Sequence, residues 1–476
     1  MKRSVCKSLC LLLTFALLVC ALPAASLAAI RTEAEDNNSY QKANPLDLGD
    51  TVRGAISEIN DNDFFTLRPT ESGYLTLRVS HAYLEDADAD WDLTVYRFTT
   101  KLEQIYDTRV EGVNPDTVLP RIGVQPGSYY VEITRGYSFD AVKNVEYRLT
   151  CDFTRTDCWE SEPNGNYTAA NPFTLGQTYG GFIGEINDRD FFRLTIAEKG
   201  YLNIKVEHEY LEDASADWDL TVYRFTTKLE QIYDTRIEGT VPETALPKIG
   251  VEPGAYYIEV TRGYSFDAVR DVEYHLSVSQ TKTDWWEAEP NDSYTAANPF
   301  TPGQTYGGFI GDMTDKDFFK VTVTEKGYLN IKVEHEYLED AAAEWTVEVY
   351  RFTTDLKSLT SEDIPGTSVS TSLPRLGVEP GTYYVSVTRG YSFDAVQDVE
   401  YHLTVGFSKN ALLLGDLDLD GSITASDARL ALRGAVGLEH FNADFTAIGD
   451  VDFDGKITAA DARKILRAAV GLEILE

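Results

Sequence analysis

The chain has 476 residues, enough for roughly three or four domains of ordinary size. It carries 77 Asp and Glu residues against 42 Lys and Arg residues, so its formal net charge is −35. Binding to nucleic-acid phosphates needs clustered Lys and Arg, so this composition argues against a nucleic-acid-binding protein. Carboxylates in this number are better suited to binding calcium.

The N-terminal segment has a basic start, then an apolar run, then small residues that end near Ala28. This order is typical of a secretory signal peptide, which we predict over residues 1–28. A lipoprotein signal ending at Cys20 is the alternative, but Val19 stands where such a signal has Gly, Ala or Ser. No later apolar run is long enough to span a bilayer. We therefore expect a secreted, extracellular chain without a membrane span.

A long segment of the chain occurs three times. The motif RGYSFDAV begins at Arg135, Arg262 and Arg389, so 262 − 135 and 389 − 262 both equal 127. A period of this length suits a self-sufficient domain rather than a solenoid unit. The predicted domain boundaries are 29–154, 155–281, 282–408 and 409–476.

Within each copy the hydrophobic pattern has a period of two. In YLTLRVS, Leu75, Leu77 and Val79 alternate with polar or amphipathic residues. Such alternation indicates half-buried strands of antiparallel sheets. Several short strands separated by Gly, Pro and Asp turns favour a β-sandwich. No segment before Leu412 has apolar residues at helical spacing over a useful length. The predicted fold class is mainly β, with three tandem sandwiches.

Five motifs follow one another in each copy. In the third copy they read EAEPNDSYTAANP, GFI, DKDFF, PGTYYV and EYHL. Residues 31–408 thereby resemble three copies of the bacterial pre-peptidase C-terminal domain, a family related to the collagen-binding domains of clostridial collagenases. The resemblance implies a jelly-roll-like β-sandwich that serves secreted proteins as a non-catalytic accessory module.

The same resemblance implies a calcium site made by the N-terminal acidic segment and by carboxylates before the DFF strand. The matching residues of the third copy are Glu287, Glu289, Asn291, Asp292, Asp315 and Asp317. The second copy offers Glu160, Glu162, Asn164, Asp188 and Asp190, and the first offers Glu33, Glu35, Asn37, Asp61 and Asp63. Gly165 and Asn38 replace Asp292 in these two copies. The alternative is that these residues are turn formers and solvated acids.

The motif DWDLTVYRF places Asp90 and Asp92 on either side of Trp91. Residues two apart in a strand point the same way, so the two carboxylates could suggest acid–base catalysis on a sugar. The third copy has Glu344 and Thr346 instead, so the pair is not a fixed feature of the repeat. A packing role for the tryptophan is therefore favoured.

Two further features bear on function. Tyr137, Tyr264 and Tyr391 recur in a loop, where they can stack on a sugar ring or a polymer, or cap the sandwich. Neither H-E-x-x-H nor G-x-S-x-G occurs, and Arg148 replaces the histidine that recurs at His275. We therefore expect no enzyme activity.

Two cysteines follow the predicted signal peptide. Cys151 and Cys158 lie seven residues apart in CDFTRTDC, and an oxidising environment favours a disulfide between them. Two free thiols are the alternative, because the other copies of the repeat lack both cysteines.

The C-terminal region contains one motif twice. GDLDLDGSITASDAR begins at Gly415 and GDVDFDGKITAADAR at Gly449. Each is an EF-hand calcium loop with oxygen ligands at positions 1, 3, 5, 7, 9 and 12, a glycine at position 6, and Asp in place of Glu at position 12. The predicted ligands are Asp416, Asp418, Asp420, Ser422, Thr424 and Asp427, then Asp450, Asp452, Asp454, Lys456, Thr458 and Asp461. A short helix follows each loop, and Leu430 and Val436 are expected in a small core.

Two loop–helix units without a helix before the first loop resemble a type I dockerin, over residues 413–473. The resemblance implies binding to a cohesin domain of a scaffoldin or cell-surface protein. The resemblance also implies that positions 10 and 11 of each loop help to choose the partner; here they are Ala425 and Ser426, then Ala459 and Ala460. Their near-identity suggests a two-fold pseudo-symmetry that permits two binding orientations. So small a domain should owe much of its stability to bound calcium.

The sequence therefore predicts a secreted, non-catalytic component of a cellulosome-type assembly, with calcium as its cofactor. The dockerin attaches it to a cohesin, and the sandwiches bind a polysaccharide, a collagen-like ligand or another protein surface. A structural spacer or adhesin is one alternative. An unrecognised glycosidase or peptidase is a second.

Overall fold

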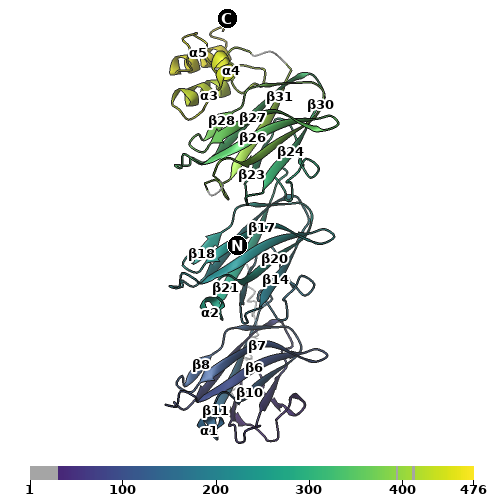
Figure 1. Ribbon diagram of the computed structural model, residues 1–476, viewed down its shortest axis with the longest axis vertical. Helices are drawn as coiled ribbons and strands as arrows, with labels where there is room; N and C mark the ends of the chain where they lie inside the picture. Colours follow the sequence, from purple (N-terminus) through teal and green to yellow (C-terminus); the bar gives the residue numbers. More distant parts are fainter. Residues whose placement is uncertain (1–29, 393–394, 410–412, 476) are drawn as a thin grey trace, which may run out of the picture.

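The computed structural model describes residues 30–392, 395–409 and 413–475. Three β-sandwiches follow one another along the long axis of the molecule, and a small helical domain lies beside the third (Figure 1). The mainly β fold class and the small helical C-terminal domain are confirmed. The predicted signal peptide, residues 1–28, lies outside the described residues.

Sandwich 1 contains two sheets. Its elements are β1 (Ile30–Thr32), η1 (Tyr40–Lys42), β2 (Asn44–Pro45), β3 (Thr51–Gly54), β4 (Asp63–Leu67), β5 (Gly73–His81), β6 (Asp90–Phe98), β7 (Leu102–Glu111), β8 (Asp116–Val118), β9 (Ile122–Val124), β10 (Ser128–Arg135), α1 (Phe139–Val142) and β11 (Tyr147–Arg155). One sheet has the order β2-β4-β10-β6-β7, and the other has the order β1-β3-β11-β5-β8 with β9 also paired to β5.

Sandwiches 2 and 3 repeat this topology. Sandwich 2 comprises β12 (Asn171–Pro172), β13 (Thr178–Phe182), β14 (Arg189–Ile196), β15 (Gly200–His208), β16 (Asp217–Phe225), β17 (Leu229–Glu238), β18 (Glu243–Ala245), β19 (Ile249–Val251), β20 (Gly254–Arg262), α2 (Phe266–Val269) and β21 (Glu273–Lys282). Sandwich 3 comprises β22 (Asn298–Phe300), β23 (Thr305–Gly308), β24 (Lys316–Val323), β25 (Gly327–His335), β26 (Glu344–Phe352), β27 (Leu356–Pro365), β28 (Ser370–Ser372), β29 (Leu376–Val378), β30 (Gly381–Arg389) and β31 (Tyr401–Ser408).

Each sandwich has its own hydrophobic core between its two sheets. Leu75, Leu77 and Val79 of β5 all point into the first core, as the alternating pattern predicts. Trp91 is fully buried and lies against His81, with ring centroids 4.6 Å apart. Trp218 and Trp345 occupy the same place in the other cores, so their packing role is confirmed. Truncating such a buried tryptophan costs about 3–5 kcal/mol.

The predicted disulfide is wrong, because Cys151 and Cys158 are both free. Cys151 lies on β11 and points into the core of sandwich 1. Cys158 follows the end of that strand and packs against the core of sandwich 2. The two thiols therefore belong to two different cores, although few residues separate them in sequence.

An aromatic contact joins each sandwich to the next. Tyr106 on β7 packs edge-on against Phe182 of sandwich 2, and its hydroxyl donates to Asp271 Oδ2 at 3.0 Å. Tyr233 makes the equivalent hydrogen bond to Asp398 of sandwich 3 at 3.1 Å. Each of these side chains is held by packing and by a hydrogen bond, so the sandwiches are docked rather than loosely tethered.

The helical domain contains α3 (Ala425–Ala435), α4 (Ala443–Gly449) and α5 (Ala459–Ala469). Helices α3 and α5 follow the two predicted loops and pack against each other. Leu430 enters the small core, and Ile423 packs against it. Val436 was expected in this core but is 63% exposed, because it follows the last turn of α3.

Candidate functional site

The first C-terminal loop folds back on its own carboxylates. Gly421, at position 6, has a φ of +90°, which favours glycine, and its N–H donates to Asp416 Oδ2 at 2.9 Å. Asp427, at position 12, is fully buried and accepts from the N–H groups of Leu417 at 2.8 Å and Asp418 at 2.9 Å. The loop thereby brings its first and last acidic residues together.

The second loop has the same construction. Gly455 also has a φ of +90°, and its N–H donates to Asp450 Oδ2 at 2.7 Å. Asp461 Oδ1 accepts from the N–H of Asp452 at 3.2 Å. Two loops of one design therefore precede α3 and α5.

Position 9 of each loop is also the N-cap of the following helix. Thr424 accepts from the N–H of Ser426 at 3.1 Å, while its own N–H donates to Asp427 Oδ2 at 2.7 Å. Thr458 and Asp461 form the same reciprocal capping box at the start of α5. Each loop closure thus also starts a helix.

Each loop gathers three acidic side chains with oxygen atoms within 4.8 Å of one another. The groups are Asp416, Asp418 and Asp427 in the first loop and Asp450, Asp452 and Asp454 in the second. Of the other predicted acidic ligands, Asp420 and Asp461 lie outside these groups of three.

The loops satisfy the requirements of a hard divalent cation. One oxygen of Asp416 and one of Asp452 are buried and accept no hydrogen bond. Burial, together with the neighbouring carboxylates, raises the pKa of Asp416 to about 6. Oxygen ligands and a local excess of negative charge are what calcium prefers, so the residues present fit this ion.

A second kind of acidic cluster lies in sandwich 3. Glu287, Glu289 and Asp317 are all buried, and one oxygen of each lies within 4.8 Å of the others. Burial, together with the negative charge of Glu289, raises the pKa of Glu287 to about 8. Tyr401 donates to Asp317 at 2.5 Å, which satisfies one oxygen of that carboxylate.

Buried oxygens without partners converge on this cluster. One oxygen of each of Glu289, Asn291, Asp315 and Asp317 is buried and accepts no hydrogen bond. Asp292 is exposed, and its carboxylate accepts from the N–H of Lys316 at 3.3 Å. A buried acceptor costs free energy when left unpaired, so this donor set also fits a calcium ion.

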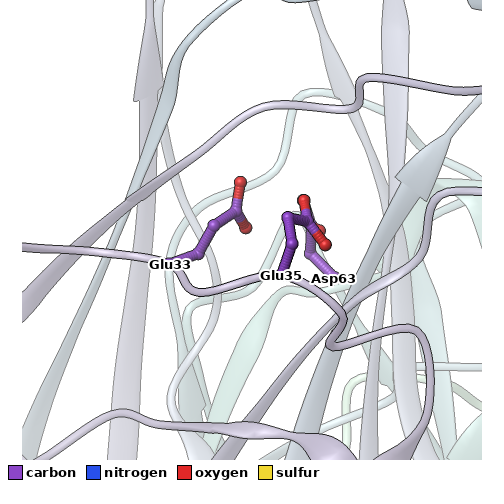
Figure 2. Close-up of side chains that lie close together, drawn as sticks. All are labelled: Glu33, Glu35 and Asp63. Atoms are coloured by element: carbon purple, nitrogen blue, oxygen red, sulfur yellow. The ribbon is translucent and has the colours of Figure 1, made fainter.

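The cluster recurs at the same repeat positions in the other two sandwiches. Sandwich 2 brings together Glu160, Glu162 and Asp190, and sandwich 1 brings together Glu33, Glu35 and Asp63. Figure 2 shows the sandwich 1 group, in which the three side chains extend to the same side of the chain. There Glu35 is exposed, whereas all three carboxylates of sandwich 3 are buried.

Contact with the preceding sandwich accounts for part of this difference. Arg97 of sandwich 1 donates to the carbonyl oxygen of Glu162, and Arg224 of sandwich 2 donates to that of Glu289, both at 3.2 Å. No sandwich precedes Glu35 to cover it in the described residues. Sequence reasoning missed this contact, since Arg97 and Glu162 lie far apart along the chain.

The positions expected to choose a partner lie at the start of α3 and α5. Ala425 and Ala459 are exposed, and Ser426 and Ala460 are half-buried. Sequence reasoning missed larger apolar side chains on the two loop–helix units. They are exposed at equivalent positions of the two units. The pairs are Leu432 with Leu466 and Val436 with Val470.

The recurring loop tyrosines point into solvent. Tyr137, Tyr264 and Tyr391 are 74%, 80% and 88% exposed. The N–H of Tyr137 donates to Asp90 Oδ1 at 2.6 Å, which anchors the loop backbone and leaves the ring free. These rings therefore do not cap the sandwich cores, and stacking on a ligand stays open to them.

Residues 414–468 match the dockerin type I domain. The helical domain is therefore a type I dockerin, as the sequence predicts. No curated protein matches the chain. Within the part of the chain that the structure describes, no helix has the length and apolarity that a membrane crossing requires.

Several solved structures are similar to the chain at low identity. The pre-peptidase C-terminal domain of collagenase from Bacillus anthracis has 19% identity and a TM-score of 0.18, covering 23% of this chain and 94% of that one. The CBM22 tandem of Xyn10C from Paenibacillus barcinonensis has 12% identity and a TM-score of 0.16, covering 48% and 85%. ZmpB from Clostridium perfringens, with its M60 and CBM51 domains, has 8% identity and a TM-score of 0.17, covering 70% and 52%.

Proposed function

We propose that this protein is a secreted, non-catalytic component of a cellulosome-type assembly. The dockerin attaches it to a cohesin on a scaffoldin or cell-surface protein, and calcium is needed for this attachment. The observation that carries the proposal is the pair of matching loop–helix units within the dockerin type I match at residues 414–468.

Calcium in each loop is held by the acidic ladder. The loop 1 ligands are Asp416, Asp418, Asp420, Ser422, Thr424 and Asp427; the loop 2 ligands are Asp450, Asp452, Asp454, Lys456, Thr458 and Asp461. Ser422 and Lys456, at position 7, each offer the backbone carbonyl oxygen. The ion would neutralise like charges that otherwise repel, and would hold each loop against its helix.

The cohesin partner contacts the start of α3 and α5. Ala425, Ser426, Ala459 and Ala460 occupy the positions that select the partner. The exposed apolar pairs Leu432 with Leu466 and Val436 with Val470 supply matching contact area on the two units. Apolar area exposed in this way favours a protein partner.

The three sandwiches bind a polysaccharide or a protein surface. The exposed rings of Tyr137, Tyr264 and Tyr391 recur once per sandwich and support this role. In sandwich 3 we propose a further calcium ion on Glu287, Glu289, Asn291, Asp292, Asp315 and Asp317. The docked junctions at Tyr106 and Tyr233 favour a second role, that of a spacer or adhesin that holds the dockerin away from other partners.

A pull-down against an array of cohesin domains, with calcium or with chelator, tests the attachment. The wild-type chain should bind at least one cohesin in calcium only. The double variant Asp416→Ala with Asp450→Ala should lose this binding, and Asp140→Ala, on α1 of sandwich 1, serves as the control. Tight cohesin binding by the double variant would contradict the proposal.

A second pull-down tests the sandwiches with insoluble cellulose, xylan, pectin, starch and collagen. Retention that is lost in the triple variant of Tyr137, Tyr264 and Tyr391 to Ala would identify the loops as the binding surface. A substrate-release assay on the same polymers distinguishes this role from that of a glycosidase or peptidase, which would release soluble product.

A further inference from the structure

The segment between α3 and α4, residues 438–442, lies along an edge of sandwich 3. β28 is the last strand of its sheet, and Thr371 in this strand forms a bridge with His440 of the dockerin. The N–H of His440 donates to the carbonyl oxygen of Ser370 at 3.3 Å. Asn442 donates from its side chain to the carbonyl oxygen of Ser372 at 3.4 Å. The dockerin thus adds one isolated bridge to the edge strand of this sheet.

Glu439 is buried at the centre of this contact. Its side chain is 1% exposed and forms ion pairs with Arg433 of α3 at 3.1 Å and with Lys332 of β25 at 3.6 Å. The hydroxyl of Ser370 donates to the same carboxylate. A buried carboxylate is costly unless it is paired and hydrogen-bonded, and here both domains supply its partners.

Comparison of the three sandwiches shows that the partners of Glu439 are arranged in this way only in the third. In sandwich 1, Arg78 on β5 pairs with Asp116 on β8. In sandwich 2, Lys205 pairs with Glu243 at the same two repeat positions, at 3.5 Å. Sandwich 3 keeps the base as Lys332 but has Ser370 in place of the acid. The missing acid of the repeat is replaced by Glu439 from the dockerin.

The two halves of the dockerin differ in how deeply the equivalent glutamate is buried. Arg467 and Glu473 form the second copy of the Arg433–Glu439 pair, at 2.8 Å, but the Glu473 side chain is 29% exposed. Sandwich 3 therefore covers one half of a pseudo-symmetric domain. The apolar pairs of α3 and α5 described above stay exposed in both halves.

We propose that sandwich 3 holds the dockerin in one fixed orientation, through a clasp formed by Glu439, Lys332 and Ser370. The clasp leaves the outer faces of α3 and α5 free for a partner and breaks the equivalence of the two halves. Each of the two binding orientations that the pseudo-symmetry permits would then place the partner at its own fixed angle to the sandwich stack. Only the identity of that partner, a cohesin, rests on the proposed function.

The variant Ser370→Glu tests the clasp in the full chain with calcium. It restores the acid that the other two sandwiches have, so it competes for Lys332 and repels Glu439. Hydrogen exchange at residues 438–442 should become at least about tenfold faster, and X-ray scattering should require a mixture of dockerin orientations. The matched control is Glu243→Ser, which removes the corresponding acid of sandwich 2 and should leave both readouts unchanged.

A second pair of variants keeps the test decisive if Ser370→Glu disturbs sandwich 3. Glu439→Gln should accelerate exchange at residues 438–442, whereas Glu473→Gln should not. Calcium titration of the helical signal confirms that the dockerin itself is folded in each variant. Unchanged exchange in Glu439→Gln, or equal effects of the two glutamine variants, would overturn the inference. A wild-type chain that binds no cohesin would refute the proposed function and leave the exchange result standing.

Discussion

The dockerin and the sandwiches use acidic clusters in different ways. In the dockerin, the acidic residues of each group come from a single short loop, and the core beneath is small. In sandwich 3, the cluster joins Glu287 and Glu289 to Asp317 of β24, above an extensive hydrophobic core. We therefore expect the first domain to need bound ions in order to fold, and the second to fold first and bind an ion afterwards.

Calcium removal should separate the two regions most strongly. In excess chelator, residues 414–468 should lose their helical structure because the paired carboxylates repel one another, while the sandwiches keep their strands. Circular dichroism and hydrogen exchange of the full chain measure both regions in one sample. If the amides of α3 and α5 stayed protected from hydrogen exchange in chelator, the dockerin would not differ from the sandwiches in its need for calcium.

The substitution Asp317→Asn should change the stability of sandwich 3 in opposite directions with and without calcium. Burial and the charge of Glu287 raise the pKa of Asp317 well above its usual value, so its ionised form destabilises the metal-free sandwich. In chelator the substitution should stabilise sandwich 3, since it removes a carboxyl whose ionised form is disfavoured in the folded state and keeps an acceptor for Tyr401.

With calcium present, the same substitution should destabilise sandwich 3, because the ion loses a charged ligand. Thermal unfolding in the two conditions gives both values, and the exposed Asp312→Asn is the control. Destabilisation of equal size in both conditions would mean that the cluster is structural and binds no ion.

Tyr106→Thr tests whether packing alone holds the sandwiches together. It gives sandwich 1 the residue that sandwich 3 has at this repeat position, Thr360. Loss of the aromatic contact and of the hydrogen bond to Asp271 should weaken the junction by about 2 kcal/mol, whether or not calcium is present. Hydrogen exchange around Phe182 measures the effect, and the exposed Tyr83→Thr is the control. A junction that loosens only in chelator would show that metal holds it instead.

The smallest expected effect is a pH dependence at the junction of sandwiches 2 and 3. Burial raises the pKa of Asp398 to about 6, above the unfolded value of 3.8. The folded state therefore binds this proton more tightly, so stability falls as pH rises from about 4 to about 6. The change should be about 1 kcal/mol after allowance for solvent screening.

Unfolding of the full chain in chelator at several pH values measures this change, and Asp398→Asn should abolish it. Stability that increases over the same pH interval in wild type but not in Asp398→Asn would contradict the assignment.

Local sequence patterns predicted the elements of both regions well. The alternation around Leu75 identified half-buried strands, and the twelve-residue spacing from Asp416 to Asp427 identified the loop and the helix after it. These patterns follow from backbone periodicity and from ligand spacing, which neighbouring residues determine. The packing role of Trp91 also followed from comparison of the three copies.

Contacts between domains could not be predicted in this way. The proximity of Cys151 and Cys158 in sequence suggested a bridge, but a domain boundary separates their cores. Val436 followed the apolar pattern of its helix, and only the packing of the helices shows that it faces solvent. One signal for the clasp was present in the sequence, namely Ser370 at a repeat position that is acidic in both other copies.

The junction contacts also determine how such an array can grow. Sandwich 1 carries Tyr106 but has Ala55 where sandwich 2 has Phe182, and sandwich 3 has lost the tyrosine. Only the middle copy carries both complementary faces. In-frame duplication of that copy would lengthen the molecule by one fixed increment each time, whereas duplication of either end copy would create a mismatched seam. The length of the stack could therefore be increased in fixed steps by repeating sandwich 2, while sandwiches 1 and 3 each carry only one junction face.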